Sequence, residues 1–77
     1  MGGGAAAGMS WLVKRSFSLS GHRTSVALEP AFWAVLERMA AAKSVPVSRL
    51  VADLDAARDS AQPLASALRI MALGSDR

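Results

Sequence analysis

The sequence predicts a small α+β domain that is mostly α-helical, and three observations lead to this class. Residues 15–28 alternate between apolar and polar side chains, which is the period of a β-strand. Three later segments, opened by Pro30, Pro46 and Pro63, repeat apolar residues at helical spacing. The chain has only 77 residues and no cysteine, so it forms one domain at most and has no disulfide to stabilise it.

The alternating segment changes phase at Ser20-Gly21, with apolar residues at odd positions before this dipeptide and at even positions after it. A two-residue hairpin turn would explain the change, and it would pair Leu19 with His22 and Phe17 with Thr24. The alternative is a single strand after the dipeptide, with an irregular basic segment before it. In the hairpin, the face opposite the apolar one would carry Ser16, Ser18, Arg23, Ser25 and Ala27.

Three helices are predicted, at residues 30–42, 46–58 and 63–73. Proline suits the first turn of each because the N–H that it lacks has no partner there. The chain then divides into a flexible Gly/Ala-rich arm at residues 1–13, a main domain at residues 14–58, and a loop with a short helix at residues 59–77.

A chain of this size needs a further source of stability, because a core below roughly 70–80 residues seldom contributes more than about 3–5 kcal/mol. A strand at residues 22–28 also needs a hydrogen-bonding partner for its backbone, and the simplest partner is the same strand of a second copy. We therefore expect a homodimer in which these strands pair. Trp33 lies off the main apolar stripe of its helix, and we expect it in the core of this dimer.

The positive charge is concentrated in the first third of the chain. The formal net charge is +3, and residues 1–28 account for all of it, with Lys14, Arg15 and Arg23 and no acidic residue. Residues 29–77 contain six basic and six acidic residues. Concentrated positive charge in a serine-rich segment indicates a polyanionic partner.

The composition argues against an enzyme. With one histidine, no cysteine and no tyrosine, no set of nucleophile, base and orienting residue can be assembled. Asp55 and Asp59 are four residues apart, but Arg58 between them indicates a solvated helix surface. We expect no catalytic residue, no cofactor and no metal site. The longest apolar run, Ala31–Leu36, is far below the roughly 20 residues of a membrane span, so we expect a cytoplasmic, nucleoid-associated protein.

Between His22 and Leu54 the chain carries a recognisable order of strand, helix, turn and helix. The residues that carry it are Arg23-Thr24-Ser25-Val26-Ala27-Leu28, Glu29-Pro30, the helix positions Phe32, Val35, Leu36 and Met39, the turn Ser44-Val45-Pro46, and the helix positions Val47, Leu50, Val51 and Leu54. This pattern resembles the ribbon-helix-helix family of DNA-binding proteins, which includes the Arc and methionine repressors. Over residues 14–73 the chain resembles a bacterial subfamily of these proteins.

The resemblance implies an intertwined homodimer, in which one strand from each chain forms a two-stranded antiparallel ribbon in the DNA major groove. By the alternation of this sequence, base readout would come from Arg23, Ser25 and Ala27. Phosphate contacts would come from the basic flank of the strand and from the start of the second helix, where free N–H groups favour anions. These phosphate-contacting residues are Lys14, Arg15, Val47, Ser48 and Arg49.

Two positions depart from the family pattern. Val45-Pro46 stands where a serine or threonine often caps the second helix, and Ala27 occupies a readout position that is frequently polar. Both changes remove polar contacts to DNA. A module that dimerises without binding DNA therefore stays open as an interpretation.

The leading hypothesis is a homodimeric, sequence-specific DNA-binding protein, a transcriptional regulator of the repressor type. The alternative is an antitoxin or adaptor protein whose main role is to bind a protein partner, such as a toxin, through the third helix, Leu64–Leu73. The apolar stripe of that helix would otherwise cover the core of the dimer.

Overall fold

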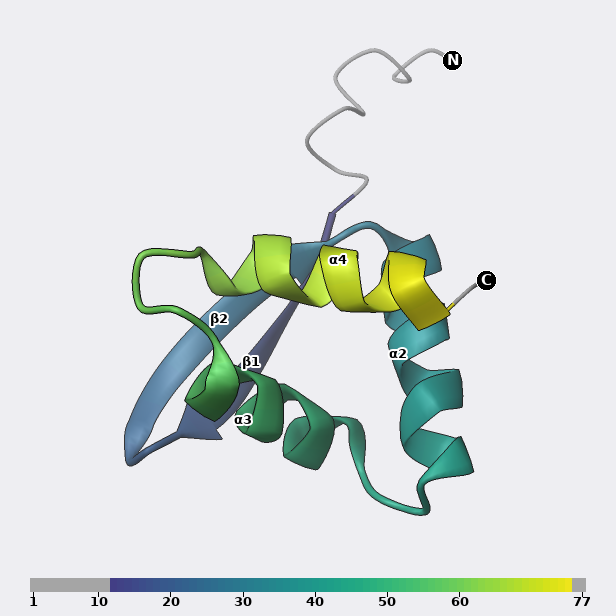
Figure 1. Cartoon of the computed structure of the whole chain (residues 1–77), viewed down its shortest axis with the longest axis horizontal. Helices are drawn as coiled ribbons and strands as arrows, with labels where there is room; N and C mark the ends of the chain where they lie inside the picture. Colours follow the sequence, from purple (N-terminus) through teal and green to yellow (C-terminus); the bar gives the residue numbers. More distant parts are fainter. Residues whose placement is uncertain (1–11, 76–77) are drawn as a thin grey trace, which may run out of the picture.

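In the computed structural model, which describes residues 12–75, a two-stranded β-hairpin is followed by three α-helices (Figure 1). The elements are β1 (Val13–Leu19), β2 (His22–Leu28), α2 (Pro30–Ala42), α3 (Val47–Ala57) and α4 (Leu64–Ser75). The predicted class, α+β and mostly helical, is confirmed. The arm predicted at residues 1–13 lies outside the described residues except at its end, where Val13 already belongs to β1.

β1 and β2 pair antiparallel along their whole length, and the predicted pairs Leu19–His22 and Phe17–Thr24 are both present. The turn between them is Ser20-Gly21, and both residues have a positive φ, 52° and 83°. Two positive φ values mark a type I′ turn, whose twist matches that of the flanking strands. Glycine reaches this region without steric cost, whereas a serine does not.

The strand at residues 22–28 therefore has its partner within the same chain. The argument that this strand needs a second copy to satisfy its backbone is wrong, because β1 supplies the hydrogen bonds along one of its edges. A two-residue turn also keeps the entropy lost on closing the loop small. The ribbon between two subunits is not tested by one chain and stays a prediction.

The helices cover one face of the hairpin (Figure 1): α3 contacts β1, α4 contacts β2, and α2 contacts both of the other helices. The strand residues that face the helices are buried, and they are Phe17, Leu19, Val26 and Leu28. The buried apolar residues of the helices are Trp33, Leu36, Ala40, Leu50, Val51, Leu64, Ala67, Leu68 and Ala72. The core of the described chain is thus formed without a second copy.

The helix starts follow the prolines, and two helix ends differ from the prediction, since α3 ends at Ala57, one residue early. α2 spans Pro30–Ala42 as predicted, and α3 begins directly after Pro46, which is its N-cap. α4 continues to Ser75, so the predicted end at Leu73 is wrong by two residues. Glycine inside a helix is only about 1 kcal/mol less favourable than alanine, and Gly74 alone does not end the helix.

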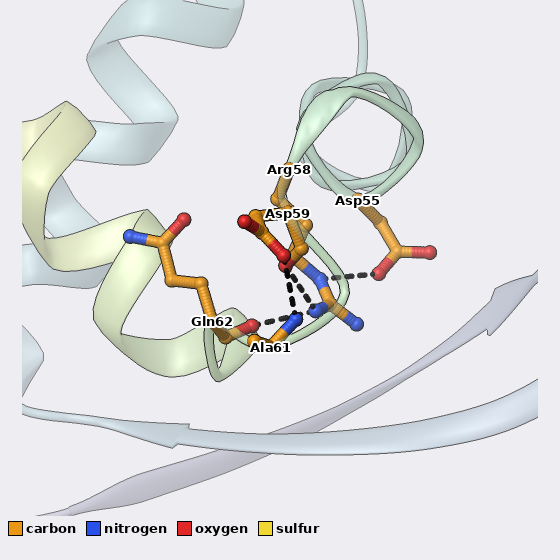
Figure 2. A network of polar contacts seen from close by, with 5 residues as sticks. All are labelled: Asp55, Arg58, Asp59, Ala61 and Gln62. Carbon is orange, nitrogen blue, oxygen red and sulfur yellow. Dashed lines mark hydrogen bonds and ion pairs between the residues drawn. The ribbon is translucent and has the colours of Figure 1, made fainter.

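Arg58 organises the loop between α3 and α4 (Figure 2). Its Nε donates to Asp55 Oδ1 at 2.9 Å, and its Nη1 donates to the main-chain oxygens of Asp59 and Gln62. The Oδ1 atom of Asp59 accepts a hydrogen bond from the N–H of Ala61 at 2.9 Å. The expectation that Asp55 and Asp59 share a solvated helix face is therefore wrong, because α3 ends before Asp59 and the side chains of Asp55 and Arg58 are half-buried together.

An ion pair joins the start of α2 to α4. Arg69 Nε lies 3.0 Å from Glu29 Oε1, and the Arg69 guanidinium carbon lies 5.8 Å from the centroid of the Phe32 ring. A hydrogen bond from its own backbone and one from Arg69 lower the pKa of Glu29 below its ordinary value of 4.5. Because the pKa is lowered in the folded state, the stabilising contribution is present at neutral pH and is lost as the pH falls through the lowered pKa.

We expect the two turn residues to respond to substitution in opposite directions. Gly21→Ala places a Cβ atom on a backbone with φ of +83° and should lower the free energy of unfolding by about 1–2 kcal/mol. Ser20→Asn should raise it by a smaller amount, because asparagine tolerates the left-handed region and is preferred in type I′ turns. Urea denaturation followed by tryptophan fluorescence measures both changes. A Gly21→Ala variant as stable as the unchanged protein would contradict the assigned turn.

Candidate nucleic-acid interface

The face of the hairpin that is turned away from the helices, here called the outer face, is formed by alternate residues of both strands. These residues are Lys14, Ser16, Ser18, Arg23, Ser25 and Ala27. Ala27 is half-buried and the other five are exposed. The register places the six as three cross-strand pairs: Lys14–Ala27, Ser16–Ser25 and Ser18–Arg23. The predicted readout residues thus share one surface with three residues of β1.

Hydrogen bonds link two of these three pairs. The Oγ atoms of Ser16 and Ser25 lie 3.2 Å apart, and either hydroxyl can donate to the other. Arg23 donates from Nη1 to Ser18 Oγ at 3.5 Å. A guanidinium has five N–H donors, so most of the donors of Arg23 stay available for another partner.

The outer face is positively charged and carries no carboxylate. Lys14 and Arg23 provide two positive charges, and residues 12–28 contain no acidic residue. Within the part of the chain that the structure describes, neither of these cations forms an ion pair. Their charge is therefore available to an external anion.

Arg15, which we predicted to contact phosphate, lies on the opposite face of β1. Its Nη2 is 2.9 Å from Glu37 Oε2, and its guanidinium carbon lies 4.6 Å from the centroid of the Trp33 ring. Arg15 has the same phase in the alternation as Phe17, so its side chain extends toward α2. The structure does not bring Arg15 together with Lys14 and Arg23.

Trp33 holds the beginning of β1 against α2. Its Nε1 donates to the main-chain oxygen of Val13 at 2.7 Å, and its ring centroid lies 5.9 Å from that of Phe17. The residue is only 2% exposed in the single chain. Its burial is therefore complete without a second copy, although we expected it in the core of a dimer.

The phosphate site predicted at the start of α3 lies on a separate element. Ser48 and Arg49 are exposed there, and Val47 is half-buried against the core. Pro46 caps the helix without a side-chain hydrogen bond, and Arg49 Nε lies 3.3 Å from Asp53 Oδ2 one turn further on. Among the described residues, no hydrogen bond or ion pair connects this segment to the outer face. Within one chain, the predicted phosphate-contacting residues at the start of α3 are therefore not linked to the predicted readout residues.

Other kinds of site are absent from residues 12–75. The described residues form no pocket and contain no group of three or more histidine, aspartate or glutamate side chains placed to hold a metal ion. None of the helices in this part of the chain is both long enough and apolar enough to cross a membrane.

Ser16 and Ser18 were predicted to lie on the outer face, but no role in binding was predicted for them. The signal for them was the phase of alternation before the turn, which gives β1 the same polar face as β2. Their position directly opposite Ser25 and Arg23 depends on the register, and the structure shows that register.

Because Arg15 and Lys14 are neighbours on β1 that point to opposite faces, we expect their removal to affect stability differently. Arg15→Ala breaks the ion pair with Glu37 and the contact with Trp33, and it should lower the free energy of unfolding by about 0.5–1 kcal/mol. Lys14→Ala should change it by less than about 0.5 kcal/mol. Urea denaturation of both variants checks this. A larger loss for Lys14→Ala than for Arg15→Ala would contradict the assignment of the faces.

Comparison with protein-family models matches residues 12–75 to the ribbon-helix-helix domain. The match covers the hairpin and the three described helices, α4 included. Neither the comparison with curated proteins nor the comparison with solved structures gave a match. Domains of this family are DNA-binding regulatory domains rather than enzymes, and they occur in transcription regulators and antitoxins. Because the match extends over most of the sequence and agrees with the order of strands and helices, the chain belongs to the ribbon-helix-helix domain family.

Proposed function

We propose that the protein is a sequence-specific DNA-binding transcription regulator of the repressor type, which acts as a homodimer and places a β-ribbon in the major groove. The observation that carries the proposal is the outer face, where Lys14 and Arg23 lie among serines without a carboxylate. The major groove is about 12 Å wide and admits a two-stranded ribbon. Membership of a family of DNA-binding domains supports the same function.

The side chains of β2 suit the donor and acceptor pattern of the major groove. Arg23 would bind a guanine with two hydrogen bonds, to O6 and N7. Ser25 would donate to or accept from a base edge, and Ala27 would contact the methyl group of a thymine. These contacts would provide specificity, since contacts to phosphate carry no sequence information directly.

The phosphate contacts in this proposal come first from Lys14, which shares the outer face with Arg23. Arg15 is left out, because Glu37 and Trp33 engage its guanidinium on the opposite face. Ser48 and Arg49 would contribute if the second subunit places the start of α3 beside the DNA backbone. Dimerisation is supported by the family and by the two-stranded sheet, in which each described strand keeps one edge without a strand partner.

We expect binding to weaken steeply with added salt, because cations on the outer face would displace counterions from DNA. Arg23→Ala should cost about 1–3 kcal/mol at a preferred site. Fluorescence anisotropy measures this with a random-sequence duplex and with the DNA upstream of the protein's own gene, each at two salt concentrations. Lys43→Ala is the matched control, since it removes one positive charge at the far end of α2 and should have a smaller effect.

Two results would contradict this function. One is binding that does not change with salt. The other is an Arg23→Ala variant that binds the upstream duplex as tightly as the unchanged protein does. Equal affinity for the upstream and random duplexes, with a clear salt dependence, would reduce the proposal to non-specific DNA binding.

A second candidate function, an antitoxin or adaptor that binds a protein partner, rests on α4. Ile70 and Leu73 are large apolar residues that are 60% and 59% exposed on this helix. Leu64 and Leu68, which belong to the stripe predicted as either partner surface or core, are buried in the core of the chain. The surface left for a partner is therefore the opposite side of the helix.

The double variant Ile70→Glu/Leu73→Glu tests this second candidate. It changes exposed residues and should alter stability little, whereas deleting residues 60–77 would remove Leu64 and Leu68 from the core. If α4 binds a partner, a protein that co-purifies in stoichiometric amount with the unchanged chain should be lost from the variant, while the affinity for DNA stays the same. The absence of such a protein, or its retention by the variant, would count against this function.

A further inference from the structure

We infer that β1 forms the phosphate-binding border of the ribbon, where Lys14, Ser16 and Ser18 contact the DNA backbone and Trp33 holds the strand in position. This inference rests on the proposed function, since it assumes a homodimer whose two β2 strands pair and bind in the major groove. It goes beyond that function because it assigns phosphate contacts to two serines and a positioning role to a buried tryptophan.

β1 and a second subunit occupy different edges of β2 in this arrangement. β1 pairs along one edge, and in the described chain the other edge has no strand partner. The pair beside a two-residue turn is hydrogen-bonded, and such pairs alternate with non-hydrogen-bonded pairs along an antiparallel ladder. The main-chain groups of Arg23, Ser25 and Ala27 therefore point to the unpaired edge. A second subunit can pair with these groups while β1 stays in place, and β1 is then the outermost strand on each side of the ribbon.

The spacing of strands sets the position of each one across the groove. Neighbouring strands lie about 4.8 Å apart, so each β2 strand would lie about 2.4 Å from the axis between the subunits and each β1 strand about 7 Å from it. Half the width of the major groove is about 6 Å. β2 thus lies over the base edges, whereas β1 lies over the sugar-phosphate backbone at the edge of the groove.

The outer-face side chains of β1 suit phosphate better than they suit base edges. A lysine ammonium and serine hydroxyls donate hydrogen bonds to phosphate oxygens. Ser18 Oγ accepts an N–H of Arg23, which leaves its own O–H for such an oxygen. The groove is about 8.5 Å deep, and a serine on an outer strand does not reach its floor. The same short side chain lets the main chain of β1 approach the phosphates closely, and residues 12–28 contain no carboxylate to repel them.

Trp33 fixes β1 from the inner face at the point where Lys14 projects outward. Its Nε1 donates to the main-chain oxygen of Val13 at 2.7 Å, and its ring centroid lies 4.6 Å from the guanidinium carbon of Arg15. Val13 and Arg15 are the two chain neighbours of Lys14, so the strand is held on both sides of this residue. Among residues 12–75, no ion pair engages Lys14 itself, and its ammonium is available to a phosphate.

Ser16 and Ser25 lie opposite each other and give a matched pair of substitutions. Fluorescence anisotropy measures the affinity for a random-sequence duplex, in which contacts to phosphate dominate. Ser16→Ala should lower this affinity about two- to tenfold per subunit, the effect of one hydrogen bond, and Ser18→Ala should do the same. Ser25→Ala, on the reading strand, and Ser60→Ala, at an exposed position in the loop after α3, should leave it unchanged.

Trp33→Phe tests the positioning role, because it keeps a ring in the core and removes the N–H that binds Val13. Lys14→Ala alone should weaken binding to the random duplex and should reduce the slope of log affinity against log salt concentration by about one per subunit. Trp33→Phe alone should give part of this loss, and in a chain that already carries Lys14→Ala it should give almost none. With Lys43→Ala in place of Lys14→Ala the two effects should add, because Lys43 lies at the far end of α2.

Arg15→Ala provides a second cycle that does not depend on the folding of Trp33→Phe. It frees the same part of β1 from Glu37 and from the Trp33 ring, while the tryptophan stays in the core. The loss that comes from removing the Arg15 charge should be the same in both backgrounds, whereas the loss that comes from displacing Lys14 should disappear in the Lys14→Ala chain. Additive effects in these cycles would overturn the positioning role of Trp33.

A disulfide across the hairpin tests whether β1 stays beside β2 in the dimer. Lys14→Cys/Ala27→Cys places two cysteines at directly opposite positions of a chain that has no other cysteine. The oxidised protein should contain the bond within one subunit, should sediment as a dimer and should bind the random duplex as tightly as its own reduced form. A loss of the dimer or of binding on oxidation would show that β1 leaves β2 when the subunits pair, and it would overturn the inference.

The outcomes separate this inference from the proposed function. If Lys14→Ala, Ser16→Ala and Ser18→Ala all bind the random duplex as tightly as the unchanged protein, β1 does not contact phosphate and the inference is wrong. A loss of affinity in Arg23→Ala would still support the proposed function in that case. If the binding of the unchanged protein does not depend on salt, the proposed function fails and the inference fails with it.

Discussion

The pairing of β1 with β2 is the constraint on which both the core and the candidate interface depend. A strand at residues 22–28 without a neighbour would leave backbone groups unpaired along both of its edges, and β1 satisfies one of them. Because side chains alternate along a strand, the same register also decides both faces of the ribbon. A slip of one residue would expose Phe17 and Leu19 and would turn Ser16 and Ser18 toward the helices. The pairing that turns the apolar side chains of the strands toward the core therefore also determines which side chains form the outer face.

The distribution of carboxylates leaves positive charge on that face. Four arginines of the described chain each lie against an acidic side chain, in the pairs Arg15–Glu37, Arg49–Asp53, Arg58–Asp55 and Arg69–Glu29. Two of these pairs, Arg15–Glu37 and Arg69–Glu29, link different elements and help to fix the arrangement of the strands and helices. Lys14 and Arg23 have no acidic residue on their own face. Residues 29–77 contain equal numbers of basic and acidic residues, whereas the outer face of the hairpin carries two cations and no carboxylate.

Much of this arrangement could be predicted from local patterns. The phase change at Ser20-Gly21 indicated the turn and the register as one of two interpretations, and the prolines predicted where the helices begin, because both signals act over a few neighbouring residues. The role of Arg15 could not be predicted, because the period of two gives the face of a residue but not the distance to Glu37 and Trp33, which depends on how α2 packs. The same limit applies to Arg58, whose partners in the loop are brought together only when α3 ends. For the candidate interface, the alternation placed Arg23, Ser25 and Ala27 correctly on the outer face, while the contribution of β1 required the observed pairing.

A ribbon anchored in this way would bind DNA with little further ordering. Trp33, Phe17 and Leu19 hold β1 from the inner side, and on the outer side Arg23 Nη1 lies 3.5 Å from Ser18 Oγ. In the proposed homodimer, a second copy would bring a second outer face to the DNA, which would raise the affinity through multivalency.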